Sequence, residues 1–394
     1  MNNTDIPSPQ EMTIADVRTI CEPNGSYFGR PSLQILEDGT WVMIYIRSKH
    51  HWKDPQGHIE VMFSADEGRT WSGKNTCLDG TPVKGLPSRP SPPGSPYDPV
   101  EPYVYLAPSG ELVVTAMKED LSGLGKGQPI VGDGCAWITV SADNGRTWDA
   151  WRKVIFENLP ESQSPDHMDL TQDSFVDGDT IYAASRMRDK DRREGSFHKA
   201  IAGLFKSPDN GRTWQFVNYI DPDVNWDRTL DCETGIERVG PTEIVAVTRG
   251  TLQGCARPWL TRSHDMGRTW SPLEQADDKV LSWKRPRIYT LKHLRHMSGA
   301  QDIPEWWNDD ILLGTGVIQV SQPPNVRNIG LWVSTDKGAS WSAPLHLDED
   351  TDDAGYGDLR MRRNGEIIIV SYHGNHETAA IKQYVVRFED GEVG

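Results

Sequence analysis

The stretch Ser141-Ala142-Asp143-Asn144-Gly145-Arg146-Thr147-Trp148 decides the fold, because five closely similar octapeptides occur along the chain. The five copies begin at Ser64, Ser141, Ser207, Ser263 and Ser334. Their aspartates lie 77, 66, 56 and 71 residues apart (143−66, 209−143, 265−209 and 336−265). Each copy follows a run of β-forming residues, so the recurrence indicates a repeat architecture.

Each position of this octapeptide has a physical role in a tight turn. The aspartate carboxylate can accept backbone N–H bonds within its own turn, and the glycine can adopt the positive φ that such a turn requires. The serine and threonine hydroxyls satisfy further local donors, and the tryptophan packs back as an apolar anchor. The motif therefore predicts a staple between two strands. Too few oxygen ligands recur in it for a calcium site.

A second periodicity predicts how many sheets the chain forms. A turn followed by a short apolar run occurs six times, and each run fits the second strand of a four-stranded antiparallel sheet. The six turns are Asp38-Gly39, Ser109-Gly110, Asp177-Gly178, Gly240-Pro241, Asn308-Asp309 and Asn364-Gly365. One staple follows each of the first five turns, and an N-terminal strand around 13–21 can complete the sixth sheet and close the ring. We therefore predict an all-β fold over residues 1–394, a single-domain six-bladed β-propeller.

Composition limits the classes of partner. The 394 residues carry a net charge of −16, which argues against nucleic acid and against an anionic membrane surface. No apolar stretch approaches the roughly 20 residues that cross a bilayer. The start of the chain lacks a signal-like region, so we expect a cytoplasmic protein. Five cysteines without CxxC spacing suggest free thiols in a reducing compartment. The oligomeric state cannot be inferred from these features.

Five staples in a six-bladed propeller resemble the Asp-box (BNR) repeats of the sialidase, or neuraminidase, superfamily, and the resemblance spans nearly the whole chain. This superfamily includes hydrolases, lyases and non-catalytic binders, so the fold alone does not assign a reaction. Antiparallel connectivity places the start of strand one, the end of strand two and the loop from strand two to strand three on the face opposite the staples. Functional residues are therefore expected at those positions.

The resemblance implies a catalytic set at these positions. Three arginines would bind the carboxylate of an acidic sugar, a tyrosine would act as the nucleophile with a glutamate as its base, and an aspartate would act as general acid and base. In the order of these roles, the matching residues are Arg30, Arg249, Arg327, Tyr356, Glu233 and Asp54.

Elementary chemistry explains why such residues belong together. Guanidinium groups bind carboxylates bidentately while remaining charged. A carboxylate nucleophile would be repelled by an anionic sugar, whereas a neutral tyrosine deprotonated by Glu233 attacks with less repulsion. Asp54 would protonate the leaving oxygen and then activate water, with retention of configuration. The resemblance thus implies an exo-sialidase acting on an acidic sugar or glycan, with no cofactor and no metal ion.

Four more residues are candidates for substrate contacts. Arg47, His50 and His51 lie at or near the expected loop between strands two and three, and Arg186 begins a charged run that we expect to form an exposed rim. A histidine paired with Tyr356 would also suit proton abstraction in a uronic-acid lyase. Another glycosidase on the same scaffold, or a carbohydrate-binding propeller that needs neither Tyr356 nor Glu233, remains an alternative.

Overall fold

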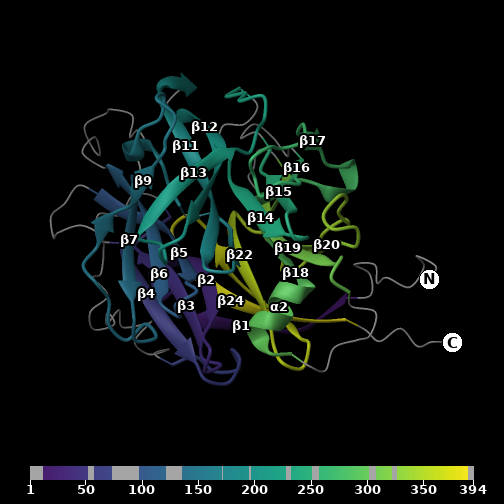
Figure 1. The fold of residues 1–394 in the computed structure, drawn as a ribbon. Helices are drawn as coiled ribbons and strands as arrows, with labels where there is room; N and C mark the ends of the chain where they lie inside the picture. The colour runs from purple at the N-terminus through teal and green to yellow at the C-terminus, as the bar shows by residue number, and fades with distance from the viewer. Residues whose placement is uncertain are drawn as a thin grey trace.

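A computed structural model describes residues 12–51, 57–72, 97–120, 135–170, 172–194, 197–227, 232–250, 257–300, 308–321 and 326–388. Within these residues the protein is an all-β, propeller-like fold in which antiparallel sheets surround a common centre (Figure 1). The inner strands of several sheets gather near the middle of the view, whereas β4 and β17 lie toward its margin.

One sheet contains both the first and the last strands of the described chain. Its strand order is β22 (Asp353–Met361), β23 (Ile367–Gly374), β24 (Ala379–Phe388), β2 (Tyr27–Ile35), β3 (Trp41–Ser48) and β4 (His58–Ser64). Strand β1 (Met12–Cys21) pairs antiparallel with β24. A single parallel residue pair, Tyr27 with Ala379, joins β24 to β2. The seven strands therefore form two antiparallel groups that meet at one point.

The other four sheets follow the chain in order. The first of them contains β5 (Tyr97–Leu106), β6 (Leu112–Asp120), β7 (Cys135–Ser141) and β8 (Arg152–Lys153), and the second contains β10 (Ser174–Asp177), β11 (Thr180–Glu194), β12 (Phe197–Ser207), β13 (Thr213–Tyr219) and β9 (Ile155–Glu157). The third contains β14 (Thr234–Arg238), β15 (Ile244–Thr248), β16 (Trp259–Ser263) and β17 (Glu274–Gln275). The fourth contains β18 (Lys284–Thr290), β19 (Leu312–Ser321), β20 (Val326–Ser334) and β21 (Leu345–His346). Strand β9 joins its sheet in parallel with β13, and the other pairs are antiparallel.

Short helices interrupt this pattern. Helix α2 (Leu291–Ser298) lies between β18 and β19, capped by the Thr290 side chain, which accepts a hydrogen bond from the His293 N–H. The sequence periodicity did not predict it. Two 3₁₀ turns, η2 (Pro165–His167) and η3 (Asp278–Val280), complete the helical content of the described residues. None of the described helices combines the length and apolar character that crossing a bilayer requires.

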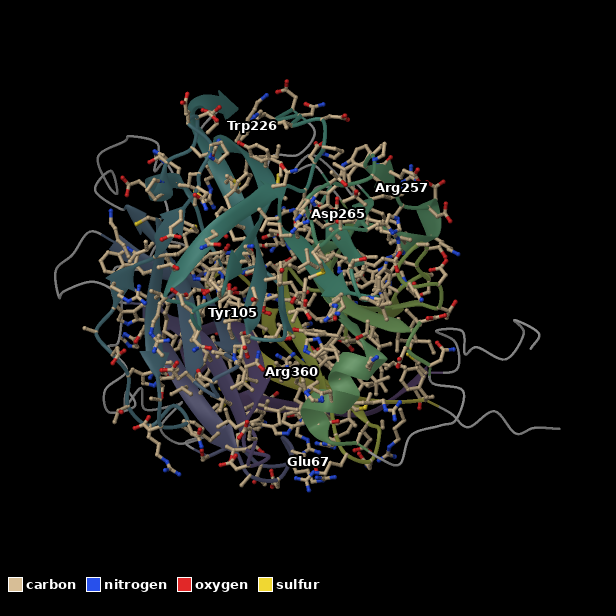
Figure 2. The ribbon with its side chains drawn as sticks, in the orientation of Figure 1. Glu67, Tyr105, Trp226, Arg257, Asp265 and Arg360 are labelled. Atoms are coloured by element: carbon tan, nitrogen blue, oxygen red, sulfur yellow. The ribbon has the colours of Figure 1, made fainter. Side chains whose placement is uncertain are left out.

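All five staples form as predicted. In the second copy, Asp143 accepts hydrogen bonds from the Thr147 N–H at 2.8 Å, the Thr147 hydroxyl at 2.6 Å and the Ser141 hydroxyl at 2.8 Å. The same three bonds recur in the other copies. Four staple tryptophans are buried, namely Trp148, Trp214, Trp270 and Trp341. In Figure 2 the staple residue Glu67 lies at the margin of the view, whereas the buried Arg360 lies toward its middle.

The staples predict acid sensitivity. Hydrogen bonds from Thr147, and then from Ser141, lower the pKa of Asp143 to about 2. In the other four copies the same local bonds outweigh burial and also lower the pKa. A depressed folded-state pKa adds stability above the unfolded value of about 4, and that stability is lost as the pH falls toward 2.

We therefore expect the free energy of unfolding to fall between pH 4 and pH 2, with a shallower fall in Asp143→Asn, which is also less stable at pH 7. Urea unfolding of both proteins at several pH values checks this expectation. If the free energy of unfolding fell equally steeply with pH in both proteins, the expectation would be contradicted.

Candidate active site

Each of six successive sheets or blades has a charged or phenolic residue at an equivalent position near the start of its first strand. In five of them it lies eleven residues before the first residue of the second strand (41−30, 112−101, 180−169, 244−233 and 367−356). In the sheet of β18 the helix α2 lengthens this distance to 27 residues (312−285). These six positions hold Arg30, Glu101, Asp169, Glu233, Arg285 and Tyr356. The chain thus delivers charged and phenolic groups to one place from strands far apart in sequence.

The backbone is distorted at four of these positions. Arg30, Glu101, Arg285 and Tyr356 have φ values of +55°, +54°, +50° and +52°, in the left-handed region that side chains rarely adopt. Each lies at a register shift between its strand and the next. Such bulges re-aim a side chain and concentrate at functional sites. The repeated strain therefore marks this end of the inner strands as a candidate site.

Tyr356 and Glu233 are in hydrogen-bonding contact. The Tyr356 hydroxyl donates to Glu233 Oε1 at 3.3 Å, and the other carboxylate oxygen accepts from Arg249 at 2.8 Å. Glu233 is buried, whereas the Tyr356 side chain is half-buried. Burial, and then the charges of Glu233 and Glu101, raise the pKa of the Tyr356 hydroxyl. Tyr356 is therefore neutral at pH 7 and lies beside a group that can accept its proton.

Arg30 lies next to Tyr356 and is buried. Its guanidinium is 5.4 Å from the centre of the Tyr356 ring, and its residue is 5% exposed. The Nε and Nη1 atoms of Arg30 make no hydrogen bond with any described residue. A buried guanidinium with unsatisfied donors is costly unless something else satisfies them. An anionic ligand at this point would do so.

The other two predicted arginines are each paired with a buried acid. Arg249 contacts Glu233, and Arg327 contacts Asp353 Oδ1 at 2.7 Å. A guanidinium has five N–H donors, so an arginine with one carboxylate partner keeps donors that can bind a ligand. These acids orient the arginines, and their burial fixes the geometry. The structure therefore brings four predicted residues to one place, Arg30, Arg249, Glu233 and Tyr356, and connects Arg327 to the same region through Asp353.

Several site residues were not found from the sequence, and Glu101 and Arg285 lie nearest to Tyr356 among them. Glu101 accepts a hydrogen bond from Arg285 at 2.8 Å and also contacts Arg186. The Arg285 guanidinium lies 4.6 Å from the centre of the Tyr356 ring. Burial alone would raise the pKa of Glu101, but Arg186 and Arg285 hold it well below its usual range. The eleven-residue spacing could have identified Glu101, whereas the inserted helix hides Arg285.

The expected position of Arg186 was wrong. It does not lie in an exposed rim but within β11, where it is 3% exposed. Its Nε donates to Asp169 at 2.6 Å, and its other nitrogens contact Glu101 and approach Glu233 to 3.9 Å. The charged run predicted a loop because charge favours exposure, yet the paired acids allow this strand to carry an arginine inward.

The remaining candidates lie in different surroundings. Asp54 is outside the described residues. Arg47 lies 3.8 Å from Glu60 and packs over the Phe28 ring. The backbone carbonyl of His50 accepts a hydrogen bond from Ser48. His51 is buried and contacts Asp353, the partner of Arg327.

Among the described residues of the site, arginines outnumber acids, although the protein as a whole is acidic. Six arginines lie in this network, Arg30, Arg186, Arg188, Arg249, Arg285 and Arg327. Four acids accompany them, Glu101, Asp169, Glu233 and Asp353. The net charge of these ten side chains is +2 (6−4), whereas the net charge of the whole chain is −16. Low-dielectric surroundings strengthen this local field, so the site favours an anionic ligand.

The sequence pattern of the family described as "BNR repeat-like domain" matches residues 99–369. The chain is 22% identical to a sialidase of Clostridium perfringens over 274 residues, which cover 66% of this chain and 65% of that protein. It is 23% identical to a sialidase of Bacteroides fragilis (strain YCH46) over 373 residues, covering 88% and 60%. The aligned region thus spans less than two thirds of these relatives.

Solved structures share the fold. A protein of unknown function from Dyadobacter fermentans superposes with a TM-score of 0.70 at 15% identity, covering 97% of this chain and 100% of that chain. The Hadza microbial sialidase Hz136 superposes with a TM-score of 0.61 at 20% identity, and the match covers 91% of this chain and 65% of that chain. The Trypanosoma rangeli sialidase superposes with a TM-score of 0.60 at 12% identity, and the match covers 91% of this chain and 54% of that chain. At these identities the likeness concerns architecture.

Proposed function

Because the chain belongs to the BNR repeat-like domain family, we propose that it is a sialidase-like exo-glycosidase that hydrolyses the bond to a terminal acidic sugar. The observation that carries this proposal is the contact between Tyr356 and Glu233 beside the unsatisfied guanidinium of Arg30. The sialidase relatives and the local excess of positive charge support an anionic sugar, and a sialic acid in particular.

We also propose that the fold is one six-bladed domain. The seven-stranded sheet divides at the Tyr27–Ala379 pair into one blade of β22, β23, β24 and β1 and another that begins with β2, β3 and β4. The recurrence of an inward residue at six equivalent positions supports the same count.

The first chemical step would form a covalent tyrosyl glycoside. Glu233 takes the proton of the Tyr356 hydroxyl, and the phenolate oxygen bonds to the anomeric carbon as the bond to the leaving oxygen breaks. Asp54 supplies a proton to that oxygen. Arg30 and Arg285, which both face the Tyr356 ring, stabilise the developing phenolate charge.

The second step would reverse these roles. Water attacks the anomeric carbon while Asp54 accepts a proton from it, and the Tyr356–carbon bond breaks. Glu233 then returns its proton to the Tyr356 oxygen. Two displacements at one carbon retain its configuration. No step requires a cofactor.

One experiment separates the alternatives. The protein is incubated with a fluorogenic sialoside, and in parallel with uronate polymers while the ultraviolet absorbance of unsaturated product is followed. Release of fluorophore, with the retained anomer appearing first by NMR, supports the proposal. Absorbance growth without fluorophore would identify a lyase instead. If neither assay detects a product while the protein still binds glycans, the protein is a carbohydrate-binding propeller.

The lyase remains the second candidate because of one observation. Burial lowers the pKa of His51 to about 4, so its imidazole is neutral at pH 7, and it contacts Asp353 beside Arg327. A neutral histidine held by a carboxylate can accept a proton, and an adjacent arginine can neutralise a uronate carboxylate.

A further inference from the structure

Two histidines and an aspartate meet beside the proposed catalytic set. His51 follows β3, Asp353 begins β22, and His376 lies in the turn between β23 and β24. One ligand atom from each lies within 4.8 Å of the others. His51 Nδ1 contacts Asp353 Oδ2, and His376 Nδ1 lies 3.4 Å from the same oxygen. The Tyr27 hydroxyl adds a fourth polar atom, an oxygen that lies 2.9 Å from Asp353 Oδ2 and 2.8 Å from His51 Nδ1.

The cluster lies where the two ends of the chain meet. Tyr27 is also the residue through which β2 pairs with Ala379 of β24, the one residue pair that joins these strands. The His51 backbone N–H donates to the His376 carbonyl at 2.8 Å. Tyr27 and His51 come from the N-terminal part of the chain, whereas Asp353 and His376 come from its end. A group that held all four would add to the strand pairing that already joins the two ends of the chain.

The donor set favours a particular class of ion. Two imidazole nitrogens and one carboxylate oxygen suit zinc and similar first-row transition metals, whereas calcium and magnesium prefer sites built from oxygen alone. A fourth position could be filled by water or by the nearby Tyr27 oxygen. The three side chains come from three separate segments, so they can approach an ion from different directions.

The cluster is accessible from solvent, and an ion would enter by separating His51 Nδ1 and Asp353 Oδ2 from their present hydrogen-bond contact. The His376 side chain is 40% exposed. It lines a surface hollow of about 520 Å³ together with Asp352, Asn375, Glu377 and Thr378. On the inner side, Arg327 and Tyr372 contact Asp353 Oδ1 and leave Oδ2 directed at the histidines. Metal-binding carboxylates are commonly hydrogen-bonded in this way by a second residue. The positive charge of Arg327 beside Asp353 would weaken binding of the ion.

We propose that His51, Asp353 and His376 bind one divalent transition metal ion of the zinc class, which stabilises the closure between the first and last strands. The proposal does not depend on the proposed hydrolysis, although Asp353 is also the partner of Arg327 in the candidate active site. Because the ligands come from both ends of the chain and the ion binds only the folded protein, the ion should raise the unfolding temperature.

The test uses the full chain stripped of metal with a chelator. Zn²⁺ is titrated by calorimetry at pH 7, and thermal unfolding is followed with and without Zn²⁺. His376→Ala removes the exposed ligand and keeps both buried ligands, His51 and Asp353, in the chain. His373→Ala is the matched control, because His373 lies three residues away and contacts the Glu349 carbonyl instead.

We expect one equivalent of Zn²⁺ to bind wild type and His373→Ala and to raise their unfolding temperatures. Binding should weaken at least about tenfold in His376→Ala, and the thermal shift should disappear. Mg²⁺ should have no effect. Absence of saturable binding, or equal binding by His376→Ala and wild type, would show that the cluster is a hydrogen-bonded Asp–His pair without an ion. Metal binding and thermal unfolding are both measured without substrate, so this outcome does not depend on catalysis.

Discussion

Replacing Tyr356 with phenylalanine is expected to lower kcat for a sialoside by at least about 10³-fold, because the proposed nucleophilic oxygen is removed. The ring should stay in place. It stacks on Tyr372 with 5.8 Å between ring centres and packs against the guanidiniums of Arg30 and Arg285. Substrate binding should therefore persist while turnover is lost. The measurement is kcat and KM with a fluorogenic sialoside, with the unfolding temperature as a check on folding.

Tyr372→Phe is the matched control for this prediction. Tyr372 belongs to the same aromatic group, is fully buried, and its hydroxyl makes a long 3.4 Å contact with Asp353. Its loss should change kcat by less than about tenfold. A Tyr356→Phe protein with activity near that of wild type would exclude tyrosine as the nucleophile. A large loss in both variants would mean that the aromatic group supports the site structurally.

Replacing Arg30 with methionine is expected to have the second largest effect, a decrease in kcat/KM of about 10²–10³-fold. A charged hydrogen-bonded pair is worth about 2–5 kcal/mol when one partner is removed, and each 1.4 kcal/mol is about a tenfold change. The loss should concern the substrate carboxylate specifically. Wild type should prefer an acidic sugar over its neutral amide, and this preference should shrink in the variant.

Stability distinguishes this role from a structural one. Arg30 is buried with two nitrogens unsatisfied, and Glu101, the described acid whose charge it balances, keeps Arg186 and Arg285 as partners when Arg30 is removed. We expect the unfolding temperature of Arg30→Met to equal or exceed that of wild type. Arg360→Met is the contrast, because Arg360 contacts Asp358 and the Leu33 carbonyl and lies at the opposite end of the inner strands. It should lower stability. A destabilised Arg30→Met with unchanged substrate preference would contradict the carboxylate role.

The staples and the second strands could be predicted from the sequence because the interactions that form them are local. Asp143 bonds to residues two and four positions away, and the turn before β6 needs only a few adjacent residues. Such bonds join residues within one octapeptide, so the turn they stabilise can be recognised from the sequence. The family resemblance then supplied the order of the site residues Arg30, Glu233, Arg249 and Tyr356.

The tertiary structure decided how the charges of the site are balanced. Glu101 meets Arg285 across 184 residues, and Tyr27 meets Asp353 across 326. No local pattern records such pairs, because the inner strands are brought together only when the ring closes. Burial then selects the partners, since an arginine carried inward on β11 requires an acid beside it. The sequence by itself determined the repeating strands and their staples, whereas only the closed structure decided which acids neutralise which arginines and left Arg30 with donors to spare.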